Sequence, residues 1–427
     1  MRRSRVAMAG GTGPRGAARR GDRVANPDAL LALRDYPHRA GALVVGVMTG
    51  TSADAVDTAM VRFDGAGAEA RPRLIAYRET ALDPALRREV LEVAAIARVE
   101  PERLMRLDLA LGELYAASVL ELLAVAAVEP GAVSAVGLHG QTIRHVPRAD
   151  GGGQAMSWQV GSAAVVAERT GLLVVSDFRA ADTAAGGEGA PLVPLVDWAL
   201  FRSRDESRVL LNLGGVANLT WLERGAGLEG VLAFDTGPGN AVIDALAEGI
   251  TQGAQRFDAD GRLALAGRAH DGLLAELLAD PFFARTPPRS TGRERFGAAY
   301  AARVLERAQA LGLAPADAIA TATELTAASV ADAIERFVTP RGAVGAIYGS
   351  GGGMKNPALV AALERRLSPA PLRSLETLGV ESDGKEALAF AFLAHRTLCG
   401  VAGNVPAATG AAHPVVLGRI TPGRWSR

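Results

Sequence analysis

Short apolar runs and longer stretches of helical periodicity alternate along most of the chain. Leu43–Met48 is rich in Val and too short for a helix, so it predicts a buried strand. Strand-like runs at Thr58–Phe63 and Leu74–Arg78 follow, separated by glycine and proline turn signals. Apolar residues three and four apart then predict helices at Pro84–Ala97 and Pro101–Val125, each with a proline in its first turn. This part of the chain therefore has the strand-then-helix order of an α/β protein.

The same order of elements occurs a second time. Strands are again expected at Arg208–Leu213, Ala217–Leu222 and Val231–Phe234, with Gly214-Gly215 in the first turn. Other strands are expected at Ala135–Leu138, Leu172–Ser176 and Gly345–Tyr348. Helices are expected at Ala163–Thr170, Ala241–Ile250, Leu273–Leu278, Ala299–Leu311, Pro315–Phe337 and Asp383–Leu398. The repeat predicts two similar α/β halves with a ligand cleft between them.

This arrangement resembles the two-domain fold of actin, sugar kinases and heat-shock ATPases, a duplicated ribonuclease H-like α/β fold with a central nucleotide cleft. In that architecture two hairpin turns lie on either side of the nucleotide phosphates, and here they would be Thr49–Ser52 and Gly214-Gly215. We expect a disordered Arg-rich tail, a first and a second α/β domain, and a C-terminal segment that packs back on the first domain, at residues 1–40, 41–180, 181–396 and 397–427.

Composition narrows the class of protein. The 427 residues are 49% hydrophobic and 22% charged, which is typical of a soluble globular protein of two or three domains. A net charge of +0 gives no reason to expect a nucleic acid or an anionic membrane as partner. No apolar run reaches the roughly 18 residues of a transmembrane helix. The single cysteine, Cys399, excludes an intrachain disulfide and suits a reducing compartment.

The turn after the first strand predicts a phosphate-binding loop. Thr49–Ser52 is rich in glycine and hydroxyl groups, so backbone N–H groups and side-chain donors can both approach an anion. Asp54 and Asp57 follow, and an acid in this position can hold a metal ion that bridges phosphates. We therefore expect nucleotide phosphates here, with Asp54 as the candidate magnesium ligand. The alternative is an ordinary hairpin turn with solvated acids.

Polar residues also follow other predicted strands, where open α/β sheets bind their ligands. After Ala135–Leu138 and Leu172–Ser176 these candidates for substrate binding are His139, Gln141, Thr142, Asp177 and Arg179. The alternative is that they are turn residues that satisfy backbone groups. Gly351 and Gly352 belong to a glycine-rich stretch that would let the backbone pass close to an adenine or ribose, although a flexible loop is equally compatible.

Asp235 is the candidate catalytic base. It follows the strand predicted at Val231–Phe234 and precedes a Gly-Pro-Gly turn, so a carboxylate there can take a proton from a hydroxyl group or a water molecule. The helix that begins near Asn240, after Gly239, would point its N-terminus at the same place and favour an anion, and Gly239 and Asn240 are also candidates for substrate binding. The alternative is that Asp235 caps a turn. Glu386, in the first turn of the last helix, is compatible with a simple helix-dipole charge.

Several well-known motifs are missing from the sequence. There is no G-x-x-x-x-G-K-[ST] loop, no strand followed by G-x-G-x-x-G with an acid about 20 residues on, and no G-x-S-x-G elbow. A P-loop ATPase, a Rossmann dehydrogenase and an α/β-hydrolase are therefore disfavoured. The reaction class that remains is phosphoryl transfer, in which the protein positions the reactants, stabilises charge and supplies a carboxylate base.

A set of segments resembles the anhydro-N-acetylmuramic acid kinase family. They are GVMTGTSADAVD (46–57), GLHGQTIRH (137–145), VVSDFRAADTAAGGEGAPLVP (174–194), LNLGGVANLT (211–220), FDTGPGN (234–240), STGRERF (290–296), GSGGGMKNP (349–357) and SDGKEALAFAFLA (382–394). They occur in family order from about residue 43 to about residue 420. The family's nucleotide loop maps onto Gly50, Thr51, Ser52, Ala53, Asp54, Ala55, Val56 and Asp57.

The resemblance implies a cytoplasmic, homodimeric enzyme of peptidoglycan recycling that uses ATP and Mg²⁺. It would convert 1,6-anhydro-N-acetylmuramic acid and water into N-acetylmuramic acid 6-phosphate. In the family the aspartate equivalent to Asp235 acts as general base on the water that attacks C1, and O6 then takes the γ-phosphoryl group. Alternatives are another sugar or carboxylate kinase of the same fold, or a non-catalytic ATP-binding switch, which needs no base aimed at a sugar.

A few positions depart from the family pattern. Ala55 stands where Gly is usual, so a positive φ there would be strained. Thr49 replaces Ser, Glu188 replaces a common Gln, and Arg289 stands where Lys is usual. Arg144 and Arg179 are candidates for binding the lactyl carboxylate, since a guanidinium group pairs bidentately with a carboxylate.

Overall fold

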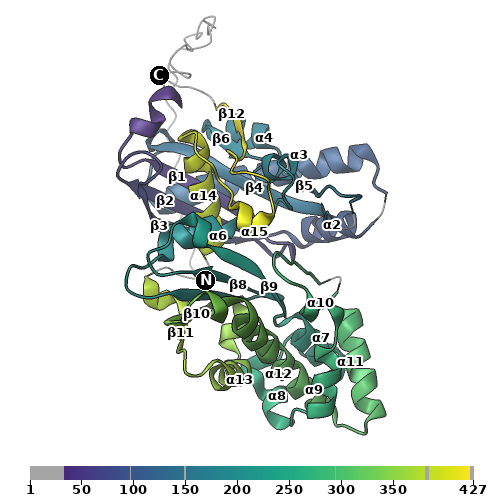
Figure 1. Ribbon diagram of the computed structural model, residues 1–427. Helices are drawn as coiled ribbons and strands as arrows, with labels where there is room; N and C mark the ends of the chain where they lie inside the picture. Colours follow the sequence, from purple (N-terminus) through teal and green to yellow (C-terminus); the bar gives the residue numbers. More distant parts are fainter. Residues whose placement is uncertain (1–32, 97, 149–150, 294, 380–383, 424–427) are drawn as a thin grey trace, which may run out of the picture.

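Two β-sheets organise the chain in the computed structural model, which describes residues 33–96, 98–148, 151–293, 295–379 and 384–423 (Figure 1). The first sheet has the order β12-β6-β4-β1-β2-β3, with β5 paired to β4. Its strands are β1 (Leu43–Thr49), β2 (Ala55–Asp64), β3 (Arg71–Ala81), β4 (Val133–Val146), β5 (Met156–Val160), β6 (Val174–Ser176) and β12 (Arg419–Thr421). The second sheet has the order β11-β10-β7-β8-β9. Its strands are β7 (Arg208–Leu213), β8 (Val216–Leu222), β9 (Leu232–Pro238), β10 (Ala346–Ser350) and β11 (Leu372–Ser374).

The two sheets repeat one topology. In each, an antiparallel meander of three consecutive strands (β1-β2-β3 and β7-β8-β9) continues into parallel strands beside its first member (β4 and β6, β10 and β11). This repeat confirms the expectation of two similar α/β halves, and with it the fold class predicted from the sequence. Most predicted strands and helices are present within a few residues of their expected limits.

Helices cover the outer faces of both sheets (Figure 1). Those next to the first sheet are α2 (Pro84–Ala95), α3 (Pro101–Val125) and α4 (Ala163–Thr170). Those of the second half are α7 (Ala241–Ile250), α8 (Arg262–Ala266), α9 (Asp271–Leu278), α10 (Pro281–Ala284), α11 (Ala298–Ala310), α12 (Pro315–Ala333) and α13 (Pro357–Leu367). Helix α12 is shorter than expected because its last predicted turn is a π-helical segment, Ile334–Val338.

The remaining elements are short or lie between the halves. They are α5 (Ala180–Ala184), α6 (Val193–Phe201), α14 (Lys385–Leu398) and α15 (Pro406–Thr409), and the short turns η1 (Tyr36–His38), η2 (Pro130–Ala132), η3 (Leu228–Gly230), η4 (Ala259–Gly261), η6 (Thr339–Arg341), η7 (Gly352–Lys355) and η8 (Leu375–Leu378). Helix α6 has no counterpart among the elements expected from the sequence. Among the described residues, no helix combines the length and the apolar character that crossing a membrane requires.

Helix α14 lies against the first sheet, although the sequence placed it in the second domain. It contacts β1, β2 and β4. A Cβ atom on Gly46 of β1 would lie 1.8 Å from the carbonyl oxygen of Ala387, and one on Gly137 of β4 would lie 2.1 Å from that of Phe390. Glycine on the strands and alanine on the helix thus allow the backbones to approach closely. The domain limits themselves remain a prediction.

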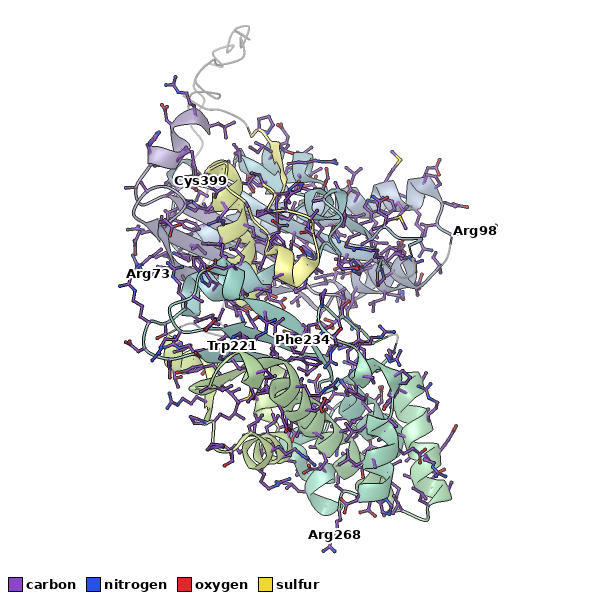
Figure 2. All side chains as sticks on the ribbon, in the orientation of Figure 1. Arg73, Arg98, Trp221, Phe234, Arg268 and Cys399 are labelled. Atoms are coloured by element: carbon purple, nitrogen blue, oxygen red, sulfur yellow. The ribbon has the colours of Figure 1, made fainter. Side chains whose placement is uncertain are left out.

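Three large apolar clusters stabilise the fold. One lies between the first sheet and helices α2 to α4, and another between the second sheet and its helices, including the buried Trp221 and Phe234 (Figure 2). The third joins the two halves through α6 and α14. It also includes Tyr36 of η1, which is 6% exposed, so part of the segment expected to be a disordered tail is packed. Residues 1–32 lie outside the described residues.

Candidate functional site

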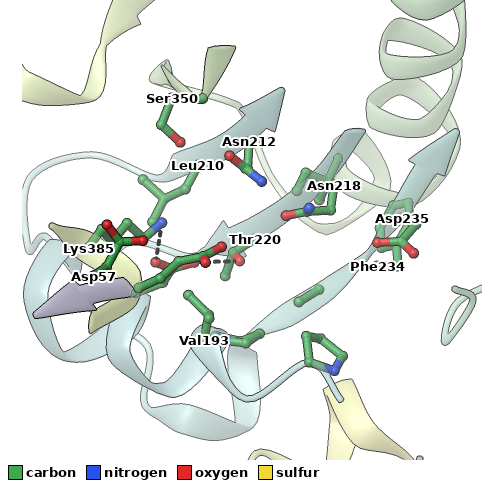
Figure 3. A pocket seen from close by; sticks show the side chains of 17 residues that line it. Asp57, Val193, Leu210, Asn212, Asn218, Thr220, Phe234, Asp235, Ser350 and Lys385 are labelled. Atoms are coloured by element: carbon green, nitrogen blue, oxygen red, sulfur yellow. Dashed lines mark hydrogen bonds and ion pairs between the residues drawn. The ribbon is translucent and has the colours of Figure 1, made fainter. Parts of the chain in front are cut away.

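A row of polar side chains crosses the second sheet. Ser350 of β10 is paired with Asn212 of β7, Asn212 with Asn218 of β8, and Asn218 with Asp235 of β9. Because side chains alternate along a strand, the flanking Leu211 and other apolar residues point into the core on the opposite face. The polar row lines a cavity of about 280 Å³ between the two halves (Figure 3).

Asp235 lies inside a strand rather than after one, which corrects the sequence-based interpretation. Strand β9 continues to Pro238, and Thr236 forms a bulge because Asn218 pairs with Asp235 while Ala217 pairs with Gly237. Bulges are frequent next to active sites, where they re-aim side chains. The Asp235 carboxylate accepts a hydrogen bond of 2.8 Å from the N–H group of Thr291, which is 56 residues away. The alternative that Asp235 caps a local turn is therefore wrong.

Arg289 fixes the backbone next to Asp235. Its guanidinium group donates to the carbonyl oxygens of Asp235 at 2.9 Å, Phe283 at 3.1 Å and Arg285 at 2.9 Å. The N–H group of Asp235 donates in return to the carbonyl oxygen of Arg289 at 3.1 Å. The side chain is buried among aromatic rings, 5.0 Å from that of Phe282, and burial lowers the pKa of Arg289 to about 10. It therefore remains charged at neutral pH.

The opposite wall of the cavity comes from α6, α14 and β2. The Lys385 ammonium group lies 2.7 Å from a carboxylate oxygen of Asp197, and the Thr220 hydroxyl group donates to the other oxygen at 2.8 Å (Figure 3). Asp57 lines the same wall and accepts a hydrogen bond of 2.6 Å from the Tyr77 hydroxyl group. The buried ion pair connects α14, α6 and β8, and so connects both halves at the cavity.

Glu386 is a carboxyl group in the cavity to which the sequence analysis gave no role in the site. Its side chain is reached by solvent at the cavity. The surrounding protein nevertheless desolvates the carboxyl group and so raises the pKa of Glu386, and the positive charges of Lys385 and Arg179 partly offset this rise. Its position in the first turn of a helix did not by itself indicate a role in the site. The contact of α14 with the first sheet, which the sequence did not predict, brings it here.

The predicted phosphate loop is a tight hairpin between β1 and β2. The N–H group of Ala53 donates to the carbonyl oxygen of Gly50 at 3.1 Å, and Ala53 has a φ of 50°. Ala55 begins β2 and does not belong to the residues with positive φ, so the strain considered at that position does not occur. The Gln141 amide group donates to the carbonyl oxygen of Gly50 at 3.2 Å and supports the turn.

Asp54 and Asp57 point to different places. Asp54 forms an ion pair of 2.8 Å with Arg87 of α2, and 64% of its side chain is exposed. Asp57 lines the cavity. Among the described residues, no cluster of three or more His, Cys, Asp or Glu side chains forms a metal site. Of the two acids, the geometry thus favours Asp57 over Asp54 as a ligand for a cation in the cavity.

His139 and Arg179 bind each other instead of facing the polar row. The guanidinium group of Arg179 lies 2.8 Å from Nε2 of His139 and donates to the carbonyl oxygen of Gly189 at 2.7 Å. Burial lowers the pKa of His139 well below its usual value, so its imidazole is neutral and Nε2 accepts the hydrogen bond. Strand β4 continues to Val146, so His139 lies within it and not after its end.

The other predicted substrate residues are distributed over several places. Thr142 accepts a hydrogen bond of 3.1 Å from Gln159 of β5. Asp177 forms an ion pair of 2.9 Å with Arg419 of β12. Arg144 donates to the carbonyl oxygen of Ile96 at 3.0 Å and does not belong to the residues that line the cavity. These residues hold first-half loops together.

The two glycine turns of the second half, at Gly214-Gly215 and at Gly239, lie next to each other. The N–H group of Gly239 donates to the carbonyl oxygen of Gly215 at 3.0 Å, and that of Asn240 to the carbonyl oxygen of Gly214 at 2.8 Å. The β7–β8 hairpin therefore lies at the N-terminus of α7. Gly351 lines the cavity next to Asn212, and Gly352 begins η7.

Comparisons with known proteins show which family the chain belongs to. Residues 42–423 match the family model "Anhydro-N-acetylmuramic acid kinase". The chain is 42% identical over 397 residues to a protein of that name from Caldanaerobacter subterraneus, covering 92% of this chain and 100% of the relative. It is 46% identical over 401 residues to one from Salinibacter ruber, covering 92% and 99%. The chain belongs to the anhydro-N-acetylmuramic acid kinase family.

The family assignment confirms the resemblance found in the sequence and favours a kinase over a non-catalytic switch. Solved structures give more distant matches. The activator of the 2-hydroxyisocaproyl-CoA dehydratase from Clostridium difficile with bound ADPNP is 11% identical, with a TM-score of 0.40 over 83% of this chain and 95% of that one. A ROK family glucokinase from Streptomyces griseus in complex with glucose and AMPPNP is 14% identical, with a TM-score of 0.34 over 82% and 97%.

Proposed function

We propose that the protein is an ATP-dependent kinase that opens the 1,6-anhydro bond of 1,6-anhydro-N-acetylmuramic acid and phosphorylates O6. The products are N-acetylmuramic acid 6-phosphate and ADP. The observation that carries this proposal is the position of Asp235, in a polar row that faces the cavity between the two halves. Membership of the family supplies the identity of the sugar.

In the proposed mechanism Asp235 is the general base. Its carboxylate takes a proton from a water molecule whose oxygen attacks C1 of the sugar, and the bond between C1 and O6 breaks. O6 keeps the electron pair and attacks the γ-phosphorus of ATP, and the bond from that phosphorus to the β,γ-bridging oxygen breaks. The Thr291 N–H group holds the carboxylate in one orientation, and Arg289 fixes the strand that carries it.

The nucleotide is expected between the two hairpins. Backbone N–H groups of Gly50–Ser52 and of Gly214-Gly215 would bind phosphate oxygens, with Gly351 and Gly352 near the nucleoside. Asn240 and the N-terminus of α7 would add donors. Asp57 fits Mg²⁺, which prefers oxygen ligands and, when bound, would neutralise phosphate charge.

Activity measurements test the proposal. Purified protein is incubated with Mg-ATP, with and without 1,6-anhydro-N-acetylmuramic acid, and the sugar product is analysed by mass spectrometry. We expect ATP turnover that depends on the sugar and a product heavier than the sugar substrate by one phosphoryl group and one water molecule. Slow ATP hydrolysis that is indifferent to the sugar would contradict the proposal and favour a switch.

Two further properties are part of the proposal because the family resemblance implies them. The enzyme is expected to be a homodimer and to act in the cytoplasm. Light scattering on the purified protein measures the first, and cell fractionation measures the second.

A further inference from the structure

The cavity that holds Asp235 carries an excess of negative charge. Its lining residues with ionisable side chains are Asp57, Asp197, Asp235, Glu386 and Lys385 (Figure 3). The basic residue among them, Lys385, is already paired with Asp197 at 2.7 Å. The phosphate chain of a nucleotide carries several negative charges, which carboxylates at close range repel. A cationic side chain for the phosphates would therefore have to come from outside this lining.

Arg293 lies directly against the β7–β8 hairpin, which is expected to bind phosphate oxygens. A Cβ atom added to Gly215 of this hairpin would lie 3.0 Å from Nε and 3.3 Å from Nη2 of Arg293. The same Cβ atom would lie 3.5 Å from Cβ of Ala241, in the first turn of α7. The guanidinium group is thus next to two backbone features that favour an anion, a glycine turn and a helix N-terminus.

The guanidinium group of Arg293 is available for a ligand. The residue is exposed, and among the residues that the structure describes it has no ion-pair partner. Other arginines of the same segment are committed, Arg289 to backbone carbonyl groups and Arg295 to Asp280. Burial raises the pKa of Asp244, on α7, to about 6, and the positive charge of Arg293 opposes this rise. Arg293 therefore faces the hairpin without an acid bonded to it.

A short turn fixes Arg293 relative to the proposed base. The N–H group of Phe296 donates to the carbonyl oxygen of Gly292 at 3.0 Å, and the side chain of Phe296 is fully buried. Two residues before Arg293, the N–H group of Thr291 donates to the Asp235 carboxylate at 2.8 Å. The same few residues thus carry both the donor that holds Asp235 and the cation that lies against the hairpin.

We propose that Arg293 binds phosphate oxygens of ATP at the β7–β8 hairpin, and that bound ATP helps through this contact to hold Asp235 in position. The inference rests on the proposed function. A guanidinium group can donate two parallel hydrogen bonds to a phosphate and stays charged at neutral pH. Contact with ATP immobilises the turn, and Thr291 then restricts the orientation of the Asp235 carboxylate. Arg293 is thus a binding residue for ATP and a positioning residue for the base.

Nucleotide affinity tests the phosphate contact. We would measure Kd by calorimetry for a non-hydrolysable ATP analogue with Mg²⁺, and by competition for adenosine, which has no phosphate. Arg293→Gln should raise Kd for the analogue about 10- to 100-fold and change Kd for adenosine less than about twofold, because only hydrogen bonds to phosphate are lost. Arg293→Lys keeps the charge without the planar group, so its Kd for the analogue should lie between the two.

Arg307→Gln is the matched control, because it removes an exposed arginine of α11 that is paired with Glu276. It should change neither dissociation constant. Arg293→Gln should also melt at the temperature of the unmodified protein, since its side chain is exposed. A merely structural role for Arg293 would instead weaken the binding of the analogue and of adenosine alike.

The positioning role is measured by kinetics at saturating ATP. Arg293→Gln should lower kcat about tenfold and change KM for the sugar less than about threefold. The inference is overturned if this variant binds the analogue as tightly as the unmodified protein, loses affinity for adenosine to the same extent, or keeps kcat unchanged. Binding is measured without the sugar, so the two proposals fail separately. A protein that binds the analogue through Arg293 but phosphorylates no anhydro sugar would overturn the proposed function and support the phosphate contact.

Discussion

Arg289 illustrates how one residue controls the geometry of a site that it does not itself line. Its planar group binds carbonyl oxygens from both the strand that carries Asp235 and the segment after α10. Lysine would keep the charge but could not donate in these directions at once. Arg289 is thus a positioning residue for Asp235.

Replacement of Arg289 by Lys should therefore reduce kcat about tenfold and leave KM for ATP unchanged. The free energy of unfolding should fall by about 2–4 kcal/mol, because buried carbonyl groups lose their donor. Steady-state kinetics and urea unfolding measure both effects. Arg307→Lys is the control, because its exposed pair with Glu276 should contribute less than about 1 kcal/mol. Equal changes in kcat and in the free energy of unfolding for the two variants would show that Arg289 does not position Asp235.

At the scale of single elements, the packing of α14 on the first sheet decides which side chains reach the cavity. Gly46 and Gly137 allow this contact, and it places Lys385 and Glu386 at the cleft. Local patterns predicted the helix, but not its partner. Hydrophobic periodicity shows which face of a helix is apolar. The sheet against which that face packs is decided by contacts between residues more than 200 positions apart in the sequence.

Gly46→Ala should destabilise the protein by about 3 kcal/mol or more, because its Cβ would meet the backbone of α14. Gly131→Ala is the matched control, since nothing lies within 4 Å of its added Cβ. Thermal unfolding compares the two. If both variants melt like the unmodified protein, the close approach of β1 and α14 is incorrect.

His395 makes the attachment of α14 dependent on pH. It is buried, accepts from the Tyr36 hydroxyl group at 2.8 Å and donates to the carbonyl oxygen of Gly67 at 3.0 Å. Burial lowers the pKa of His395 to about 4. The folded-state pKa thus lies below the unfolded value of about 6.5. The neutral, buried His395 therefore contributes its full stabilisation of the fold above pH ~6.5, and this contribution is lost as the pH falls toward 4.

Between pH 7 and pH 5 the unmodified protein should lose about 2 kcal/mol of unfolding free energy through this group. His395→Gln should remove that part of the pH dependence, although other groups such as His139 still contribute. Urea unfolding of both proteins at the two pH values gives the difference. If the unfolding free energy changes equally with pH in the two proteins, His395 is not buried in its neutral form.

At the scale of the whole molecule, the two halves share an apolar cluster around α6 and α14, and a buried ion pair lies at its edge. The sequence predicted the duplicated topology well, because each half repeats the same order of strands and glycine turns. It did not predict α6, nor Thr291 and Arg289 next to Asp235. Those contacts join segments more than 50 residues apart, which no local pattern encodes.

Lys385→Met should destabilise the protein by about 3–5 kcal/mol, because Asp197 would keep a buried charge without its partner. The double variant Lys385→Met, Asp197→Asn should recover part of this loss, since no buried charge then remains. Urea unfolding of the single and double variants measures the coupling. Additive losses would indicate that the two residues do not interact.

In the proposed mechanism Asp235 activates the water that opens the sugar. We would follow a single turnover in ¹⁸O-water by mass spectrometry, comparing the unmodified protein with Asp235→Asn and with Asp64→Asn, which alters an exposed ion pair. We expect ¹⁸O at C1 and phosphate on O6 for the unmodified protein and Asp64→Asn, and no product from Asp235→Asn. Product formation at an unchanged rate by Asp235→Asn would contradict it.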